Sequence, residues 1–430
     1  MSYTFREKPQ TTIPSTIELP TIAHHTLSGG DQLHLLTTNT TSLIQLELKY
    51  KAGSWHQEIP FQALITSKML SEGTSGYNAK SIAETIDFYG GYYALSVDKD
   101  VSTIQFVFPK IYLDKILPII SEMLFKSVIP EKELQIVTEN IAHQIKMDDQ
   151  RGDVIANKRL FALIFGDKHP YGRSGSPEEV KLLTQENVLN FYKSHYQEQC
   201  FDIFIVGDIA ESDIAIIDTY LSPKRTINPI TIKNHSLDIT PPSNIVIHRE
   251  QSTQASIRIG KMMFNQHHLD YIPLHFASTV LGGYFGSRLM SNLREDKGYT
   301  YGVGSYLISY LHSGFFGIST EVSLEHTDAA IAEIERELSI MHNTYIDEEE
   351  LLRVKNYLIG NYLKSFDGAF NLMGQYTSIL TKELPLSYPQ DYLDAVSKIT
   401  ATDIKNMINK YLQLETLTTV VVKNTNNKTR

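Results

Sequence analysis

Histidines and the single cysteine are the side chains through which this chain could bind a metal or attack a substrate, and their spacing limits both. Cys200 is the only cysteine, which excludes an internal disulfide and a cysteine-based zinc site and fits a reducing cytoplasm. His169, in His-Pro-Tyr-Gly, has no second histidine or carboxylate at ligand spacing. We interpret His169 as a turn or capping residue, and His56, His24-His25 and His267-His268 as solvated or loop residues.

Other chemistries lack their motifs. The chain has no Gly-x-x-x-x-Gly-Lys-Ser/Thr phosphate loop and no Gly-x-Ser-x-Gly nucleophile elbow. Its 430 residues include 42% hydrophobic and 20% charged ones, enough for a large core. The net charge of −10, without a basic run, argues against a nucleic-acid partner. The polar N-terminus through Thr12 and the absence of a long apolar run predict neither a signal peptide nor a membrane span, so we expect a cytoplasmic protein.

Proline-containing and polar segments between Leu221 and Ile245 interrupt every helical or strand period. We therefore expect an N-terminal half (1–221), a linker (222–245) and a C-terminal half (246–430). Both halves have the same order of hydrophobic periods, which suggests an internal duplication.

In the first half the periods predict strands at Ser42–Tyr50, within Tyr92–Pro109 and at Phe201–Gly207, and helices at Phe61–Leu70, Leu113–Phe125, Glu131–Met147, Val154–Phe165 and Gln185–His195. In the second they predict strands at Ala255–Phe264, Gly302–Ile308, Gly314–Glu321 and Leu417–Val422, and helices at Ile272–Leu281, Thr327–Met341, Glu348–Lys364, Leu372–Thr381 and Ala401–Tyr411. This order predicts an α+β fold: two similar halves, each a β-sheet covered by helices on one face, facing each other across a cavity.

Several short strings, in order, give the chain a resemblance to the zinc metallopeptidases of the insulinase and pitrilysin type, the M16 family. They are Ala52-Gly-Ser54, Met69-Leu-Ser-Glu-Gly-Thr74, Gly90-Gly-Tyr-Tyr-Ala94 followed by Asp98-Lys-Asp100, His169-Pro-Tyr-Gly172, Val206-Gly-Asp208, Leu281-Gly-Gly-Tyr-Phe-Gly-Ser-Arg-Leu289 and Leu293-Arg-Glu-Asp-Lys-Gly-Tyr-Thr-Tyr301. The resemblance spans nearly the whole chain and is closest to small bacterial and mitochondrial-processing-peptidase-like members.

Active members of this family carry His-x-x-Glu-His on a helix, with two histidines and a downstream glutamate binding zinc while the motif's glutamate activates water. Aligned on Met69-Leu, the two histidines fall on Leu64 and Lys68 and the catalytic glutamate on Ser67. The downstream ligand falls on Gln144, 76 residues after Lys68. An ammonium repels a divalent cation and a leucine has no lone pair, so we predict no metal site and no cofactor in this chain.

The family's C-terminal half supplies an arginine and a tyrosine that contact the substrate carbonyl and the developing oxyanion. Arg294 and Tyr301 match both positions. A guanidinium and a phenol are donors that do not titrate near neutral pH, as oxyanion stabilisation requires. The alternative is that both side chains only pack beneath the Gly282-Gly283 turn.

The segment Tyr92–Val97, with Ala94 and Leu95, corresponds to the family strand whose edge pairs with the substrate backbone. Its alternative is an ordinary covered strand.

The resemblance thus implies a non-catalytic subunit that pairs with a zinc-bearing insulinase-family homologue and contributes Arg294 and Tyr301 to peptide cleavage in a shared chamber. Zinc would be present only in the partner, and a homodimer in the partner's absence stays open. Two alternatives remain: a peptide-binding or structural homologue without a role in proteolysis, and an active zinc metalloendopeptidase with a non-standard site.

Overall fold

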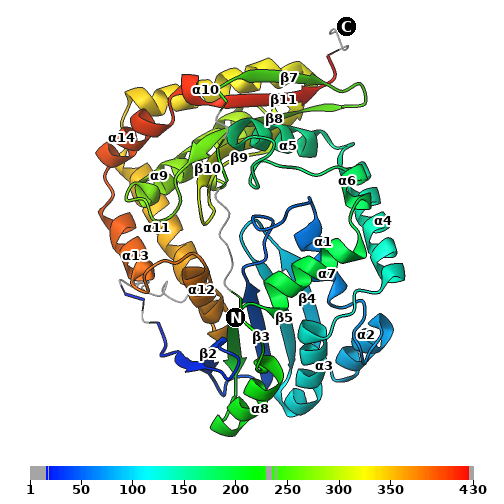
Figure 1. The fold of residues 1–430 in the computed structure, drawn as a ribbon. Helices are drawn as coiled ribbons and strands as arrows, with labels where there is room; N and C mark the ends of the chain where they lie inside the picture. Colours follow the sequence, from blue (N-terminus) through cyan, green and yellow to red (C-terminus); the bar gives the residue numbers. More distant parts are fainter. Residues whose placement is uncertain (1–15, 18, 229–234, 238–239, 426–430) are drawn as a thin grey trace, which may run out of the picture.

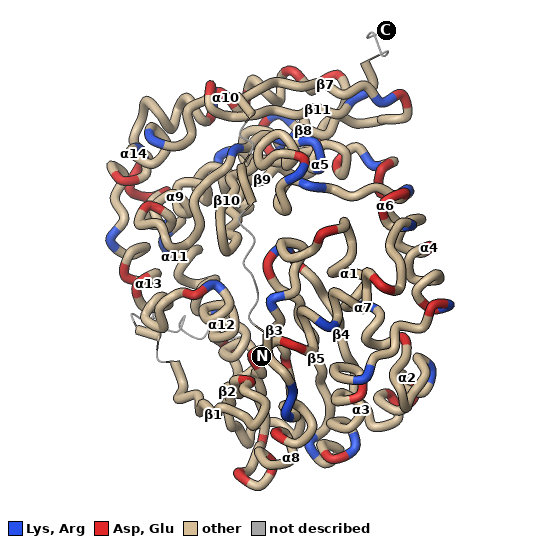
Figure 2. Tube along the Cα trace, in the orientation of Figure 1, with Lys and Arg blue, Asp and Glu red and all other residues tan. Residues whose placement is uncertain are grey.

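The computed structural model describes residues 16–17, 19–228, 235–237 and 240–425, and Figure 1 shows them arranged around two β-sheets. The polar N-terminus through Thr12 and part of the expected linker lie outside the described residues. Among the helices in the described ranges, none is long and apolar enough to cross a membrane. Basic and acidic residues alternate along the drawn trace and do not gather on one element (Figure 2).

The first sheet has six strands in the order β1-β2-β6-β3-β5-β4, so β1 and β4 are its edges. Its strands are β1 (Ala23–Thr26), β2 (Gln32–Thr37), β3 (Leu43–Tyr50), β4 (Tyr92–Val97), β5 (Ser102–Pro109) and β6 (Asp202–Gly207). The helices of this half are α1 (Gln62–Met69), α2 (Ala79–Phe88), α3 (Leu113–Phe125), α4 (Glu131–Asp148), α5 (Gly152–Phe165), α6 (Pro177–Lys181), α7 (Gln185–Tyr192) and α8 (Glu211–Leu221). Only the β2–β6 pair is parallel among these strands.

The alternating sequence of β3 explains why the two faces of this sheet differ. Ile44, Leu46 and Leu48 are fully buried in the core that α3 and α8 cover. Their neighbours Gln45 and Glu47 point to the opposite face, because successive side chains of a strand alternate. The result is one apolar face under helices and one polar face toward the second half of the molecule.

The second sheet has five strands in the order β7-β11-β8-β10-β9. They are β7 (Asn244–His248), β8 (Gln254–Met263), β9 (Thr300–Ser309), β10 (Gly314–Ser323) and β11 (Thr418–Lys423). The helices are α9 (Tyr271–Ser278), α10 (Thr327–Asn343), α11 (Glu348–Lys364), α12 (Ala369–Thr381), α13 (Tyr388–Lys398) and α14 (Ala401–Tyr411). Again one pair, β7–β11, is parallel and the others are antiparallel.

The two halves repeat one order of elements. In the first half, β3 and α1 are followed by β4, β5, α3, α4 and α5. In the second half, β8 and α9 are followed by β9, β10, α10, α11 and α12. The predicted α+β fold of two similar halves is confirmed. A cavity of about 680 Å³ lies between the polar face of the first sheet and the helices α11 and α12 of the second half. Gln45, Glu47 and Gln105 line it from the sheet, and Asn361 and Lys364 from α11.

The hydrophobic period missed several short elements. These are α2, α6, α8, α13, β1, β2 and β7. His24 and His25, interpreted as solvated or loop residues, lie in β1, whose backbone pairs with β2. The four-residue β1 is largely exposed and carries no alternation of apolar side chains, so its sequence has no strand signal.

One helix of each half packs on the sheet of the other half. Helix α5 packs on β8 and β11, where Ala156, Leu160 and Ile164 meet Phe315 and Val420. Figure 1 shows α5 beside the second sheet, although it precedes the linker in sequence.

In return, α12 packs on β6 of the first sheet. Its Met373 and Tyr376 are buried against Leu36, Phe204 and Val206. Burying a large apolar side chain contributes about 1.5–3 kcal/mol, so these two contacts bind the halves to each other.

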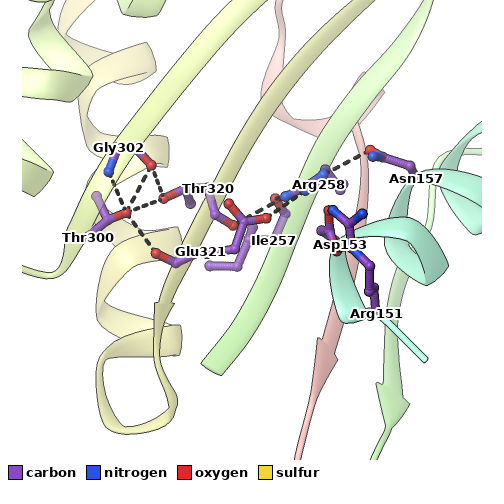
Figure 3. Close-up of polar contacts among 9 residues, drawn as sticks. All are labelled: Arg151, Asp153, Asn157, Ile257, Arg258, Thr300, Gly302, Thr320 and Glu321. Carbon is purple, nitrogen blue, oxygen red and sulfur yellow. Dashed lines mark hydrogen bonds and ion pairs between the residues drawn. The ribbon is translucent and has the colours of Figure 1, made fainter. Parts of the chain in front are cut away.

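Arg258 of β8 provides the polar part of the α5 contact (Figure 3). Its side chain is buried at 5% exposure. Nε donates to Asn157 Oδ1 of α5 at 2.8 Å, and one terminal nitrogen bonds Glu321 Oε1 of β10 at 2.6 Å. The other terminal nitrogen donates to the carbonyls of Ile257 and Thr320. The guanidinium is therefore almost fully satisfied, and Asn157 carries its link to the other half.

Asn157→Ala should destabilise the protein by about 1.5–3 kcal/mol, because it leaves a buried Arg258 N–H without its acceptor. Chemical denaturation of the purified chain measures this. The exposed Asn140→Ala on α4 is the matched control and should change stability by less than about 0.5 kcal/mol. Equal stability of the two variants would show that the Asn157 contact contributes nothing.

Candidate functional site

A cavity of about 670 Å³ lies between α1, the edge strand β4 and α4. It contains three of the four positions that the family alignment picks out: Leu64 and Lys68 from α1, and Gln144 from α4. Leu95 of β4 also lines it. The remaining lining residues are Phe61, Ser71, Glu72, Tyr93, Val137, Asn140, Ile141, Ile145 and Asp148.

Helix α1 presents Leu64 and Lys68 to this cavity because the rest of the helix is buried. Ile65 and Met69 pack against α4 in the core, and Ser67 is 1% exposed. Residues four apart share one face of a helix, so Leu64 and Lys68 point the same way. Ser67, at the predicted position of the catalytic glutamate, lies outside the cavity lining.

The polar groups of the cavity do not form a metal site. Lys68 brings an ammonium, and Gln144 Nε2 donates to Asp148 Oδ1 at 3.1 Å. Burial raises the pKa of Glu72, and the neighbouring Glu133 raises it further while Lys68 lowers it. Among the described residues, no group of three or more histidine, cysteine, aspartate or glutamate side chains could hold a metal ion. The residues at the family's zinc position do not fit zinc, because they offer a positive charge and an aliphatic chain instead of lone pairs.

A second cavity of about 390 Å³ adjoins the first and shares Phe61 and Leu64 with it. Val97, at the end of β4, and Lys99 line this cavity, together with Lys158 and Arg173. Along β4, Tyr93 and Leu95 thus face the first cavity and Val97 the second. The two cavities form a continuous hollow beside an edge strand.

The structure does not bring Arg294 and Tyr301 into either cavity. Arg294 lies in a π-helical turn, Met290–Asp296, with its guanidinium 4.9 Å from the ring centre of Phe285. Tyr301, at the start of β9, is 90% exposed.

The neighbour of Tyr301, Thr300, accepts a hydrogen bond from Gly302 N and donates to Glu321 O (Figure 3). This fixes the backbone that carries Tyr301 while leaving its phenol in solvent. Ala94 is exposed and, since β4 alternates, faces away from Leu95.

Sequence reasoning missed the α4 wall of the first cavity apart from Gln144. Val137, Ile141 and Ile145 recur every four residues on α4, which is the spacing of a single helix face. That period predicts a packed face, and the sequence did not indicate that part of this face lines a cavity.

Three histidines contact Trp55 where the first half, the linker and the second half meet. The ring centres of His312, His235 and His169 lie 4.1, 4.7 and 5.5 Å from that of Trp55. His169 Nδ1 accepts a hydrogen bond from Tyr171 N at 3.1 Å, as the turn interpretation predicts. His56 lies next to His195 at the same junction.

Burial and neighbouring titratable groups lower the pKa of two of these rings, His56 and His169. Burial lowers the pKa of His56 to about 4, with further lowering from His195, His312, Lys51 and His235. Burial likewise lowers the pKa of His169 to about 4, aided by His235, Lys99 and His312.

Comparison with known proteins agrees with this geometry. A sequence model of the family described as "Peptidase M16 inactive domain" matches residues 182–358. An uncharacterized zinc protease of Rickettsia felis is 24% identical over 88% of this chain and 92% of its own length. The chain is thus similar to M16 peptidases over most of its length. A probable inactive metalloprotease of Bacillus subtilis, YmfF, is 22% identical over 90% of this chain and 95% of its own length.

The fold of the chain also matches a solved structure. The crystal structure of a peptidase M16 inactive domain from Pseudomonas fluorescens superposes with a TM-score of 0.86 at 23% identity, covering 94% of this chain and 98% of that one. No two histidines of the present chain are four residues apart, so it contains no His-x-x-Glu-His anywhere.

Leu64→His, Lys68→His and Gln144→Glu together should add one zinc equivalent to the chain, because the three positions line one cavity and would supply three ligands with water as the fourth. Metal analysis after zinc loading and dialysis measures the difference from the unchanged chain. Lys68→Ala alone should add none. Equal zinc content of the triple variant and the unchanged chain would mean that the three side chains do not converge.

The histidine junction should make the protein acid-sensitive. Between pH 6.5 and about 4, His56 and His169 are protonated in the unfolded chain but stay neutral in the folded one. The free energy of unfolding therefore falls as the pH is lowered through this window. We expect a loss of roughly 2–4 kcal/mol, at about 1.4 kcal/mol per pKa unit with allowance for solvent screening. Denaturant titrations followed by fluorescence of Trp55, the only tryptophan, measure it.

His169→Asn keeps an acceptor for Tyr171 N and should reduce this acid sensitivity. His143→Asn, at an exposed position of α4, should leave it unchanged. An acid response identical in both variants would place the titrating groups elsewhere.

Proposed function

We propose that this chain is a non-catalytic M16 subunit that binds an extended peptide along β4 and pairs with a zinc-bearing homologue. In that pair it contributes Arg294 and Tyr301 to stabilising the substrate carbonyl and oxyanion. We propose the cytoplasm as its compartment, on the basis of the single cysteine.

The observation that carries the peptide-binding part is the hollow beside β4. An edge strand has unpaired backbone N–H and C=O groups that can pair with an added strand, whatever its sequence. Two connected cavities lie along the same strand and could receive alternate side chains of that peptide. Phe61, Leu64 and Tyr93 offer apolar contacts, and Lys68 offers a positive charge.

The loss of the zinc ligands supports a role without autonomous catalysis. The cavity keeps its place between α1, β4 and α4, yet Leu64 and Lys68 occupy the histidine positions. A peptide in this cavity would meet neither a metal nor a general base at Ser67, which is buried. We therefore assign to this cavity binding rather than cleavage.

The exposure of the Arg/Tyr pair supports action on another chain. The side chains of Arg294 and Tyr301 make no hydrogen bond to any described residue, and Tyr301 projects into solvent. Donors held on a fixed backbone and left unpaired are available to a substrate in the partner's half of a shared chamber.

The experiment is a fluorogenic-peptide assay of the purified chain, alone and mixed with a co-expressed homologue that carries His-x-x-Glu-His. We expect activity only in the mixture. Arg294→Ala or Tyr301→Phe should lower kcat by about 10²–10³-fold, as loss of one oxyanion donor does elsewhere. Arg159→Ala and Tyr345→Phe, at exposed positions away from the cavities, serve as matched controls.

The other outcomes identify the alternatives. Full activity of the mixture with Arg294→Ala and Tyr301→Phe would exclude the shared-site role and leave a peptide-binding or structural protein. Chelator-sensitive activity of the isolated chain would overturn the proposal in favour of an active peptidase with a non-standard site. A homodimer formed without the partner would appear in the mass of the isolated chain by light scattering.

A further inference from the structure

Two histidines face each other across the edge of the first sheet, and neither lines any of the cavities described above. His24 of β1 and His34 of β2 are direct partners in the antiparallel pairing. Their Nδ1 atoms are 3.1 Å apart. His34 is 8% exposed, whereas His24 is on the surface. The pair therefore consists of one buried imidazole and one imidazole that solvent can reach.

Asp202 determines which nitrogen of His34 carries the proton. His34 Nε2 lies 2.9 Å from Asp202 Oδ1 on the adjacent strand β6. An ionised carboxylate only accepts, so Nε2 is the donor, and in the neutral ring Nδ1 keeps its lone pair. That lone pair points at His24. A carboxylate behind the far nitrogen of a histidine is the usual arrangement that orients a metal-binding imidazole.

The second ring also has a partner behind it. Tyr376 of α12 places its hydroxyl 3.3 Å from His24 Nε2. With Nδ1 of His24 committed to a ligand, Nε2 carries the ring proton and can donate to this hydroxyl. The ring of His34 is stacked on Phe204 with centres 4.6 Å apart, which fixes its plane. Both imidazoles are thus held with Nδ1 directed to the same point.

The spacing of the two nitrogens suits a metal ion. Imidazole binds Zn²⁺ at about 2.0–2.1 Å, which places two ligand nitrogens about 3.3 Å apart in a tetrahedral site and about 2.9 Å apart at a right angle. The observed 3.1 Å lies between these values. A metal between them would replace one weak nitrogen–nitrogen hydrogen bond with two coordinate bonds.

We propose that His24 and His34 bind one divalent transition-metal ion that favours imidazole, Zn²⁺ or Cu²⁺, through their Nδ1 atoms, oriented by Asp202 and Tyr376. Water completes the coordination, because the described part of the chain brings no third histidine, cysteine or carboxylate close enough to act as a ligand. The ion ties β1 to β2 under α12, the helix that the second half lends to this sheet. This site is independent of the function proposed for the β4 cavities.

The test is a Zn²⁺ titration of the EDTA-stripped, dialysed chain, with the midpoint of thermal unfolding and the bound equivalents as readouts. We expect Zn²⁺ to raise the unfolding midpoint of the unchanged chain and of His25→Ala, whose side chain is on the other face of β1. His24→Ala, at an exposed position, and His34→Gln should each lose one bound equivalent and this stabilisation. Asp202→Asn should weaken binding roughly tenfold to a hundredfold.

Cu²⁺ with electron paramagnetic resonance gives a second readout that does not depend on stability. The unchanged chain should show nitrogen couplings from two imidazoles that His24→Ala removes. Equal Zn²⁺ binding by His24→Ala and the unchanged chain would overturn the proposal, since any bound zinc would then belong to other histidines such as those around Trp55. Circular dichroism of each metal-free variant establishes that a loss of binding is not a loss of fold.

Discussion

The exchange of helices between the halves is the contact on which the rest of this structure depends. Neither sheet is complete by itself: α5 covers part of the second sheet and α12 covers part of the first. The apolar residues of α5 share one cluster with residues of the second sheet, and Nε of Arg258 is satisfied by Asn157 of the opposite half. A buried guanidinium that lost this partner would carry a desolvation cost without compensation. The relative position of the halves, and hence of every feature between them, follows from these two helices.

Local periodicity in the sequence accounts for much of the fold. The alternation of Ile44, Leu46 and Leu48 predicts β3, and the four-residue spacing of Val137, Ile141 and Ile145 predicts α4. Elements whose stability comes from pairing and caps were missed. Helix α2 begins at an Asn78 cap whose side chain accepts from Ser81 N at 2.8 Å, a signal that a search for caps would have found. The exchange of α5 and α12 could not be predicted, because periodicity identifies an apolar face without identifying which sheet covers it.

In the candidate site, too, some features follow from local sequence spacing and others depend on tertiary packing. Leu64 and Lys68 are four apart on a helix, so their shared direction follows from sequence spacing alone. The convergence of Gln144 on them came from a family resemblance and depends on how α4 packs beside α1. Arg294 and Tyr301 are seven residues apart but sit on a π-helical turn and on a strand. Sequence spacing therefore says little about their mutual placement, and neither cavity beside β4 contains them.

The exchanged helices also bear on how the chain is made. Helix α5 ends at Phe165, yet two of the residues that cover it, Val420 and Val422, belong to the last strand of the chain. During synthesis, part of the apolar face of α5 stays uncovered until β11 has left the ribosome. The first half thus cannot bury the apolar face of α5 fully before the second half is made. A truncated chain would expose that face to other proteins. A topology that holds the finished molecule together leaves an apolar helix face exposed on its unfinished precursors.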